Sequence, residues 1–281
     1  MSSKIAIGVN TFKTDVNRFK VANQSYERLS TLDDVDVYDI QKPGIKGTFN
    51  TIDKLQRTAK DVIKGYQKDL PFVNDLFDIM ADIDCDYFIV TNADIMISNR
   101  LIKHIREHEI TALPCQRLDV KPINHISESL IPLKWEIAGF DVFCFNTNWY
   151  RKHSWLFEDY IQGKPVYDHV YAGLMKVFGN NDIIANKNPA MCVHEHHGNA
   201  SHIKDGAVEF NNEAREKSKL KQFNFVWDDY FAKVLLPGRG IQEPRYRFLH
   251  EIKNEAAVER DFFAKRIAGI QNLIDDEKNR H

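Results

Sequence analysis

The chain has 281 residues, enough for one large domain or for one domain with a substantial appendage. Hydrophobic residues make up 43% and charged residues 28%, which is typical of a globular protein with a sizeable core. Its 38 Lys and Arg residues nearly balance its 40 Asp and Glu residues, so the net charge of -2 gives no overall attraction to nucleic acid or anionic membrane. No apolar run approaches the ~20 residues that span a bilayer. The cysteines form no CxxC pair, so we expect a cytoplasmic protein with reduced core thiols.

Apolar runs and spacings predict alternating strands and helices up to about residue 200. Short apolar runs predict strands at 4–9, 35–40, 87–90, 110–113, 140–145 and 191–194. Apolar residues at helical spacing predict helices at 51–66, 71–80, 100–108 and 168–178. The run at 87–90 does not alternate, which is typical of a strand covered on both faces. This order of elements predicts an α/β sandwich.

Residues that favour helix ends accompany three of these helices. Asn50 or Thr51 is placed to cap the first helix. Asp69 is placed to cap the second, which has Pro71 in its first turn. Gly179 follows the last helix and is expected to close it.

The character of the chain changes towards its C-terminus. Residues 213–221 are densely charged, and residues 223–236 are rich in aromatic side chains. Apolar residues from Ile252 to Ile274 form one stripe, which predicts an amphipathic helix. We expect a catalytic domain at 1–202 and a mostly helical extension at 203–281 that packs on it. The stripe also leaves open a contact in a homo-oligomer or with a membrane surface.

The sequence Asn92-Ala93-Asp94 follows the predicted strand at 87–90. Ligands of an α/β sheet gather at the carboxyl ends of its strands, where alternate residues point the same way. A polar turn would also explain Asn92 and Asp94. The residues after Asp94 are apolar again, however, which places its carboxylate near the core. Because a buried, unpaired carboxylate is costly, we expect a metal ion or a cationic partner.

Four histidines follow the last predicted strand, namely His194, His196, His197 and His202. His194 comes directly after an apolar run and should lie at the strand end. The other three also fit an exposed polar loop. A carboxylate oxygen and an imidazole nitrogen, completed by phosphate oxygens and water, suit Mn²⁺ or Mg²⁺. The sequence therefore predicts a metal site that contains Asp94 and His194.

Two further acidic residues, Asp141 and Asp168, are candidates for catalytic roles in the site. Asp141 is the only charge in the strand at 140–145, so it should have a defined partner. Gly139, just before it, leaves room for a ligand to approach the backbone. Asp168 precedes an apolar helix, where an ordinary N-cap is the competing explanation.

Together these residues resemble the GT-A-fold glycosyltransferases, which use nucleotide sugars. The resemblance covers roughly residues 1 to 202 and implies a GT-A-like, Rossmann-like α/β/α sandwich. That family carries an Asp-x-Asp motif after a central strand. Here the motif is Asn92-Ala93-Asp94, with an amide in the first position. The resemblance implies that Asp94 and His194 bind the metal ion on the donor diphosphate.

The resemblance also assigns roles to residues outside the metal site. It implies a nucleotide-sugar contact for Val9, Asn10, Thr11, Asn92 and Gly139. Asp141 would belong to the strand on the sugar and acceptor side. Asp168 falls where inverting members of the family place a carboxylate base.

We therefore predict a metal-dependent glycosyltransferase. It would move a hexose or pentose from a nucleoside-diphosphate sugar to an acceptor hydroxyl, with Mn²⁺ or Mg²⁺ neutralising the leaving diphosphate. Asp168 would take the acceptor proton in an inverting reaction and would mainly position substrate in a retaining one. The acceptor stays open between a glycan, a glycoconjugate and modified DNA.

Three other classes of protein compete with this prediction. A metal-dependent hydrolase would use the cluster at 194–197, but no HxHxDH arrangement accompanies it. A nucleotidyltransferase would need a Gly-rich, basic phosphate loop after the first strand, where Gly8-Val9-Asn10-Thr11 stands instead. No GxGxxG or P-loop sequence occurs. A noncatalytic binding module would need no metal-binding residues, and metal-dependent turnover separates it from the enzyme.

Overall fold

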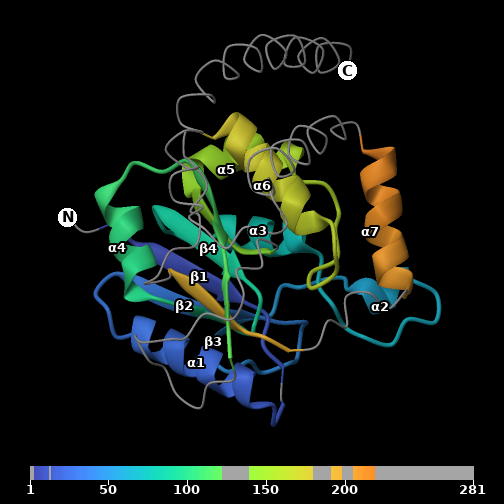
Figure 1. The fold of residues 1–281 in the computed structure, drawn as a ribbon, viewed down its shortest axis with the longest axis horizontal. Helices are drawn as coiled ribbons and strands as arrows, with labels where there is room; N and C mark the ends of the chain where they lie inside the picture. Colours follow the sequence, from blue (N-terminus) through green and yellow to red (C-terminus); the bar gives the residue numbers. More distant parts are fainter. Residues whose placement is uncertain (1–2, 13, 122–138, 180–190, 198–204, 219–281) are drawn as a thin grey trace, which may run out of the picture. The chain divides into compact units, whose positions relative to one another are not determined.

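The computed structural model describes residues 3–12, 14–121, 139–179, 191–197 and 205–218 (Figure 1). The chain forms two compact units, residues 1–224 and 225–281, and every described residue belongs to the first. No helix in the described ranges is long and apolar enough to cross a membrane. The helix predicted at 252–274 lies outside the described residues.

A central sheet forms the middle layer of the first unit. Its strands are β1 (Ile5–Val9), β2 (Val35–Ile40), β3 (Asn50–Ile52), β4 (Tyr87–Thr91), β6 (Ala112–Gln116) and β8 (Phe140–Asn146). They lie in the order β3-β2-β1-β4-β8-β6. The first four run parallel, and β8 runs antiparallel to both of its neighbours. The parallel strands therefore end at one edge of the sheet, where ligands of such sheets bind.

A second, smaller sheet begins where the chain leaves the carboxyl end of β4. Its strands, in order, are β5 (Ile95–Ile97), β9 (Cys192–Glu195) and β7 (Leu118–Val120). The chain enters β5 directly after the turn that ends β4. The pairing places His194 of β9 opposite Ile95 on one side and opposite Asp119 on the other. The small sheet thus brings the histidine cluster to the residues that follow β4.

Helices cover both faces of the central sheet (Figure 1). The helices of the described residues are α1 (Asn17–Leu29), α2 (Ala59–Val62), α3 (Val73–Ala81), α4 (Asn99–Glu107), α5 (Thr147–His153), α6 (Tyr167–Phe178) and α7 (Gly206–Lys217), with a 3-10 turn at Ser154–Leu156. α1 and α4 share one apolar core with the small sheet. α3, α5 and α6 supply aromatic side chains to the opposite face. This arrangement confirms the predicted α/β sandwich.

Alternate residues of a strand serve the two cores, as the period of two requires. On β8, Val142 and Cys144 belong to the core shared with α1. Phe143 and Phe145 point to the other face, where their ring centroids lie 5.7 and 4.9 Å from that of Phe77 in α3. β4 and, apart from Asp141, the inner part of β8 are therefore apolar without alternation because both faces are covered, as predicted for β4.

The helix predicted at 51–66 is wrong over most of that range. Asn50 and Thr51, its predicted caps, lie in the edge strand β3, which pairs with β2. Only the four residues of α2 are helical, and they follow the N-cap Thr58. Gly65 has a φ of 79°, which no α-helix accommodates. The backbone pairing of the strand thus overrides the helical spacing of the apolar residues.

The predicted cap of α3 is also wrong. The N-cap is Phe72. Asp69 instead accepts hydrogen bonds from Lys42 Nζ and Thr58 Oγ1, each at 3.1 Å. The carboxylate therefore ties the chain after β2 to the start of α2. Gly179 does end α6, as predicted.

Helix α7 packs on the chain segments around α3 and α6. The rings of Phe210 and Phe72 lie 5.6 Å apart, edge to face. Asn211 is buried, and its amide bonds to the backbone of Ile161 and Pro165, just ahead of α6. α7 therefore helps to fix the loop that leads into α6. The domain boundary at residue 202 stays a prediction.

Candidate metal centre and active site

Asp94 lies in the turn between β4 and β5. Tyr26 of α1 holds this turn, because its hydroxyl donates to the backbone oxygen of Ile95 at 2.5 Å and to that of Asn92 at 3.2 Å. The Asp94 side chain is 16% exposed. Its carboxylate therefore stands at the carboxyl end of β4, close to the core, where the sequence places it.

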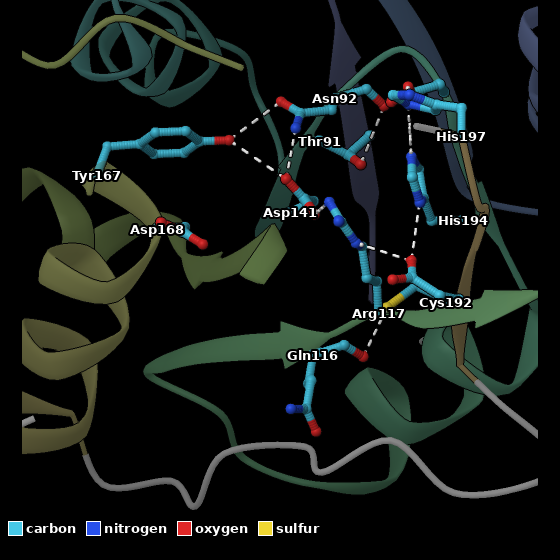
Figure 2. A network of polar contacts seen from close by, with 12 residues as sticks. Thr91, Asn92, Gln116, Arg117, Asp141, Tyr167, Asp168, Cys192, His194 and His197 are labelled. Carbon is cyan, nitrogen blue, oxygen red and sulfur yellow. Dashed lines mark hydrogen bonds and ion pairs between the residues drawn. The ribbon is translucent and has the colours of Figure 1, made fainter. Parts of the chain in front are cut away.

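Two histidines converge on this carboxylate. Asp94 Oδ2 lies 3.6 Å from His194 Nε2 and 3.5 Å from His197 Nε2. The two imidazole nitrogens are 3.2 Å apart. One ligand atom from each residue lies within 4.8 Å of the other two. Figure 2 shows the contact between the His194 and His197 rings, which meet edge to face.

The orientation of the His194 ring is fixed by Asp119, on the side of the ring away from Asp94. Its Nδ1 lies 2.8 Å from Asp119 Oδ1, so the neutral ring carries its proton on Nδ1 and leaves Nε2 as an acceptor. Nε2 then faces two other electron-pair donors, the Asp94 carboxylate and the His197 ring. Lone pairs gathered in this way favour a proton or a metal ion between them. The three side chains therefore fit a divalent cation.

The charges around the cluster keep Asp94 ionised. Burial raises the pKa of the Asp94 carboxyl, but His194, His197 and Arg18 outweigh burial and hold it well below its usual range. Burial also lowers the pKa of His194, yet its hydrogen bonds to Asp119 and Asp94 raise it overall. A negative carboxylate is thus available to a cation at neutral pH.

Arg18, near the start of α1, adds a positive charge beside the cluster. Its Nε lies 3.4 Å from Asp94 Oδ2, and its guanidinium carbon stands 4.6 Å from the centroid of the Phe19 ring. The side chain is 22% exposed. Asp94 therefore has a cationic neighbour as well as the two histidines, and this neighbour comes from a helix that the sequence patterns did not predict.

A second group of polar side chains lies beside the metal cluster, around Asp141 (Figure 2). The buried carboxylate accepts hydrogen bonds from Asn92 Nδ2 and Arg117 Nη1, and from Tyr167 Oη at 3.4 Å. Tyr167 Oη also donates to Asn92 Oδ1 at 3.2 Å. Burial raises the pKa of Asp141 more than Arg117 lowers it. The partner predicted for Asp141 is thus Arg117.

Asp168 is the second residue of α6 and does not cap it. The N-cap is Val166, whose φ of 95° is rare for a β-branched residue. The Asp168 side chain is 16% exposed and lies 3.7 Å from His169 Nε2. Its charge acts on Arg117 and on Asp141, raising the pKa of both. Capping therefore does not explain this carboxylate, which lies beside the Asp141 group (Figure 2).

The space beside Gly139 is filled by the protein itself. Gly139 has a φ of 122°, and a Cβ added there would lie 3.0 Å from Cζ of Arg117. The backbone N–H of Arg117 also donates to the Gly139 oxygen at 3.2 Å. The missing Cβ of Gly139 thus makes room for the arginine, and a ligand contact for Gly139 stays a prediction.

The three residues predicted to contact the nucleotide lie at the carboxyl end of β1. Val9 is buried in the core. Asn10 Nδ2 donates to the Ile40 oxygen at 2.6 Å, and the Thr11 backbone N–H donates to Asp39 Oδ1 at 3.0 Å. Their polar groups thus bind the end of β2, and a nucleotide contact for them stays a prediction.

Comparison with known proteins finds likeness in structure. No protein-family model and no curated sequence matches the chain. Its structure is similar to that of S. aureus TarS 1-349, at 10% identity and a TM-score of 0.45, over 87% of this chain and 68% of that one. It is also similar to the mannosyltransferase PcManGT from Pyrobaculum calidifontis in complex with GDP-Man and Mn²⁺, at 11% identity and 0.42, over 92% and 81%.

A further similar structure is the galactosyltransferase LgtC in complex with donor and acceptor sugar analogs. Its identity to this chain is 10% and its TM-score is 0.34, over 80% of this chain and 95% of that one. All three TM-scores are below 0.5, so the resemblance to the GT-A-fold glycosyltransferases rests on the sequence motifs.

Three charged side chains of the site were not predicted from the sequence, namely Arg18, Arg117 and Asp119. For Arg117 and Asp119, the sequence pattern of the segment 116–120 indicates a strand. They alternate with Leu118 and Val120, which are buried, so the pattern is that of a strand with one polar face. The sequence allows His197 to lie either in an exposed loop or in the site. The structure places it in the cluster with Asp94 and His194.

Proposed function

We propose that this chain is a metal-dependent glycosyltransferase that moves a sugar from a nucleoside-diphosphate sugar to an acceptor hydroxyl. The observation that carries the proposal is the convergence of Asp94, His194 and His197 at the carboxyl end of β4. A cation there would stand at the edge of the sheet where nucleotide ligands of α/β proteins bind. When bound, it supplies positive charge to the leaving diphosphate.

The donor set favours Mn²⁺ over Mg²⁺. Mg²⁺ takes oxygen ligands in near-ideal octahedral geometry, whereas imidazole nitrogen suits the transition metals. With His197 added to Asp94 and His194, two of the three protein ligands are nitrogens. The sequence left both ions open, and the second histidine supports Mn²⁺.

The charges divide the proposed site into two halves. Arg18 stands beside Asp94, so this half attracts the negative diphosphate of the donor. Asp141 and Asp168 lie in the other half. Their carboxylates would repel a diphosphate, but they do not repel the sugar and the acceptor hydroxyl, which are neutral. We therefore assign the diphosphate to the Arg18 side and the transferred sugar to the Asp168 side.

In this assignment Asp168 is the proton acceptor of an inverting reaction. It stands in the first turn of α6 and is partly exposed, so an acceptor hydroxyl can reach it. Asp141 is buried and engaged by Asn92, Arg117 and Tyr167. We assign it to holding Asn92 and Tyr167 in place rather than to exchanging a proton. In a retaining reaction Asp168 would position substrate only.

The metal-dependent hydrolase gains no support from the described geometry. It would use the cluster at 194–197 as a unit, but only His194 and His197 join the ligand group, and the third member is Asp94. The backbone N–H of His196 donates to the Val120 oxygen at 2.9 Å, as part of the extended pairing of β9 with β7. The nature of the acceptor stays open.

A turnover screen tests the proposal. Purified protein is incubated with nucleoside-diphosphate sugars and either Mn²⁺ or a chelator, and release of free nucleoside diphosphate is followed. The proposal expects release from at least one donor with Mn²⁺ and none with chelator. p-Nitrophenyl phosphate serves as the hydrolase substrate. Metal-dependent cleavage of that ester, with no donor turned over, would contradict the assignment.

A further inference from the structure

The Asp119 carboxylate lies buried between a histidine and an arginine. Its Oδ1 is 2.8 Å from His194 Nδ1 and 3.1 Å from Arg117 Nε. The side chain is 4% exposed, against 6% for His194 and 23% for Arg117. A single oxygen thus joins a proposed metal ligand to a buried guanidinium.

We propose that Asp119 and Arg117 are positioning residues, which set the orientation of His194 and join the metal half of the site to its transfer half. The proposal rests on the proposed function, because it takes Asp94, His194 and His197 as metal ligands. Neither positioning residue belongs to that ligand group.

The backbone supports the placement of Asp119. Strands β7 and β9 run parallel, and Asp119 is the partner of His194 in their register. The two side chains therefore meet because the strands pair, without help from a mobile loop. A carboxylate behind a metal-binding histidine fixes the ring and its proton, and removing it typically costs 10–100-fold in metal affinity.

Arg117 stands at the junction of the two sheets. It is the residue between the end of β6 in the central sheet and the start of β7 in the small sheet. Its Nη1 donates to Asp141, which in turn accepts from Tyr167, the neighbour of Asp168 in α6. A planar guanidinium binds two carboxylates at fixed angles, which a lysine cannot do. Gly139 leaves the space that this side chain fills.

The resulting chain of contacts runs from Tyr167 through Asp141, Arg117 and Asp119 to His194 (Figure 2). Moving the arginine would displace both carboxylates together. Metal binding and sugar transfer are therefore expected to depend on the same buried ion pairs, although none of these three charged residues needs to touch the metal ion.

The test is Mn²⁺ affinity, measured from the electron paramagnetic resonance signal of free Mn²⁺. Asp119→Ala is expected to weaken Mn²⁺ binding by about 10–100-fold. Asp119→Asn keeps an oxygen that can accept from His194 Nδ1, so it should retain part of the affinity. It also provides the measurement if the alanine variant fails to fold. Asp75→Ala is the matched control, since Asp75 accepts two 2.8 Å hydrogen bonds from Arg57 outside the site. It should bind Mn²⁺ like the wild type.

The outcomes separate this inference from the proposed function. If Asp94→Ala binds Mn²⁺ as the wild type does, or the wild type binds none, the metal centre is wrong and both proposals fall. If Asp94→Ala loses Mn²⁺ while both Asp119 variants keep full affinity, the metal centre stands and the positioning role is overturned. A loss in the Asp119 variants that Asp75→Ala shares equally would show general destabilisation and would also overturn it.

Discussion

Two arginines of this protein each hold a pair of aspartates, in different places and with different consequences. We call these groups the Arg57 clamp and the Arg117 clamp. Their members are Arg57 with Asp75 and Asp159, and Arg117 with Asp119 and Asp141. Each clamp joins segments that are distant in sequence. The same three ionic groups thus occur twice in one chain.

Exposure separates the two clamps. In the Arg57 clamp the side chains are 37%, 20% and 43% exposed, in the order arginine, then the two aspartates. In the Arg117 clamp the corresponding values are 23%, 4% and 6%. The exposed clamp is hydrated and screened, so it contributes little to stability. The buried clamp is costly to break, because each unpaired charge would remain away from water.

The further contacts of the aspartates differ as well. Asp159 of the Arg57 clamp accepts from Asn74 at 2.8 Å, and among the described residues neither aspartate of this clamp bonds to a further side chain. In the Arg117 clamp one carboxylate continues to His194 and the other to Asn92 and Tyr167. An ion-pair motif is therefore a structural tie in one place and part of a site in the other. Burial and the next set of contacts decide which.

The largest expected difference comes from removing each arginine. Arg117→Met removes the guanidinium that pairs with two buried carboxylates, so we expect the free energy of unfolding to fall by about 3–5 kcal/mol. Urea denaturation, monitored by circular dichroism, measures it. A fall below about 1 kcal/mol would mean that the buried clamp is no more important to folding than a surface pair.

Asp168→Asn tests whether the residue that accepts the acceptor proton is Asp168, which lies beside the Arg117 clamp. The substitution keeps the shape of the side chain and removes its basicity, so transfer should fall by about 10²–10⁴-fold if Asp168 accepts the acceptor proton. Donor binding and the unfolding midpoint should stay unchanged. The measurement is sugar transfer at saturating donor. Turnover close to that of the wild type would remove Asp168 from the chemistry.

Arg57→Met is the matched change in the exposed clamp. The pairs it breaks are partly hydrated, so we expect a loss of about 1 kcal/mol in the free energy of unfolding. Mn²⁺ affinity should not change, because the clamp has no contact with the metal cluster in the described structure. Urea denaturation and the Mn²⁺ titration check both expectations. A weakened metal site in this variant would contradict the division between the clamps.

The smallest expected effect is a difference in response to acid. Hydrogen bonds from Arg57 lower the pKa of Asp159, so its stabilising contribution is present above pH about 4 and is lost as the pH falls below that value. Burial raises the pKa of Asp141, so its ionisation costs stability as the pH rises from about 4.

Urea denaturation between about pH 3 and pH 5 therefore separates the two aspartates, taking these limits as about one unit on either side of the unfolded pKa. The advantage of the wild type over Asp159→Asn should shrink as the pH falls. The advantage over Asp141→Asn should grow. Parallel curves for the two variants would contradict the assigned directions.

The strands were predicted well because burial on both faces leaves an apolar run that no other element explains. β1, β4 and β8 have this pattern, whereas buried and half-buried residues alternate in the first part of β2. All four strands lie within one or two residues of their predicted bounds. The edge strand β3 has no such run, because its residues are exposed or half-buried. Its hydrogen bonds to β2 form it, and a pairing partner is not visible in a local pattern.

The site was predicted in part for a similar reason. Asp94 and His194 were found because each interrupts or ends an apolar strand, which is a local signal. Arg18 and Asp119 reach the cluster through a helix packed under β5 and through the pairing of β7 with β9. Those are contacts between distant segments. The helix α1 was not predicted, although its buried residues lie at helical spacing, namely Val21, Ala22, Ser25, Tyr26 and Leu29.

Calorimetry of nucleoside diphosphate binding, with and without Mn²⁺, tests the central claim most directly. The wild type should bind at least one of the common nucleoside diphosphates more tightly with Mn²⁺ than with chelator, because the phosphate oxygens complete the coordination of an ion held by Asp94, His194 and His197. Asp94→Ala should lose this enhancement while keeping its fold, and His194→Ala should show a smaller one. Equal binding by the wild type in chelator, or full metal dependence in Asp94→Ala, would contradict the metal centre.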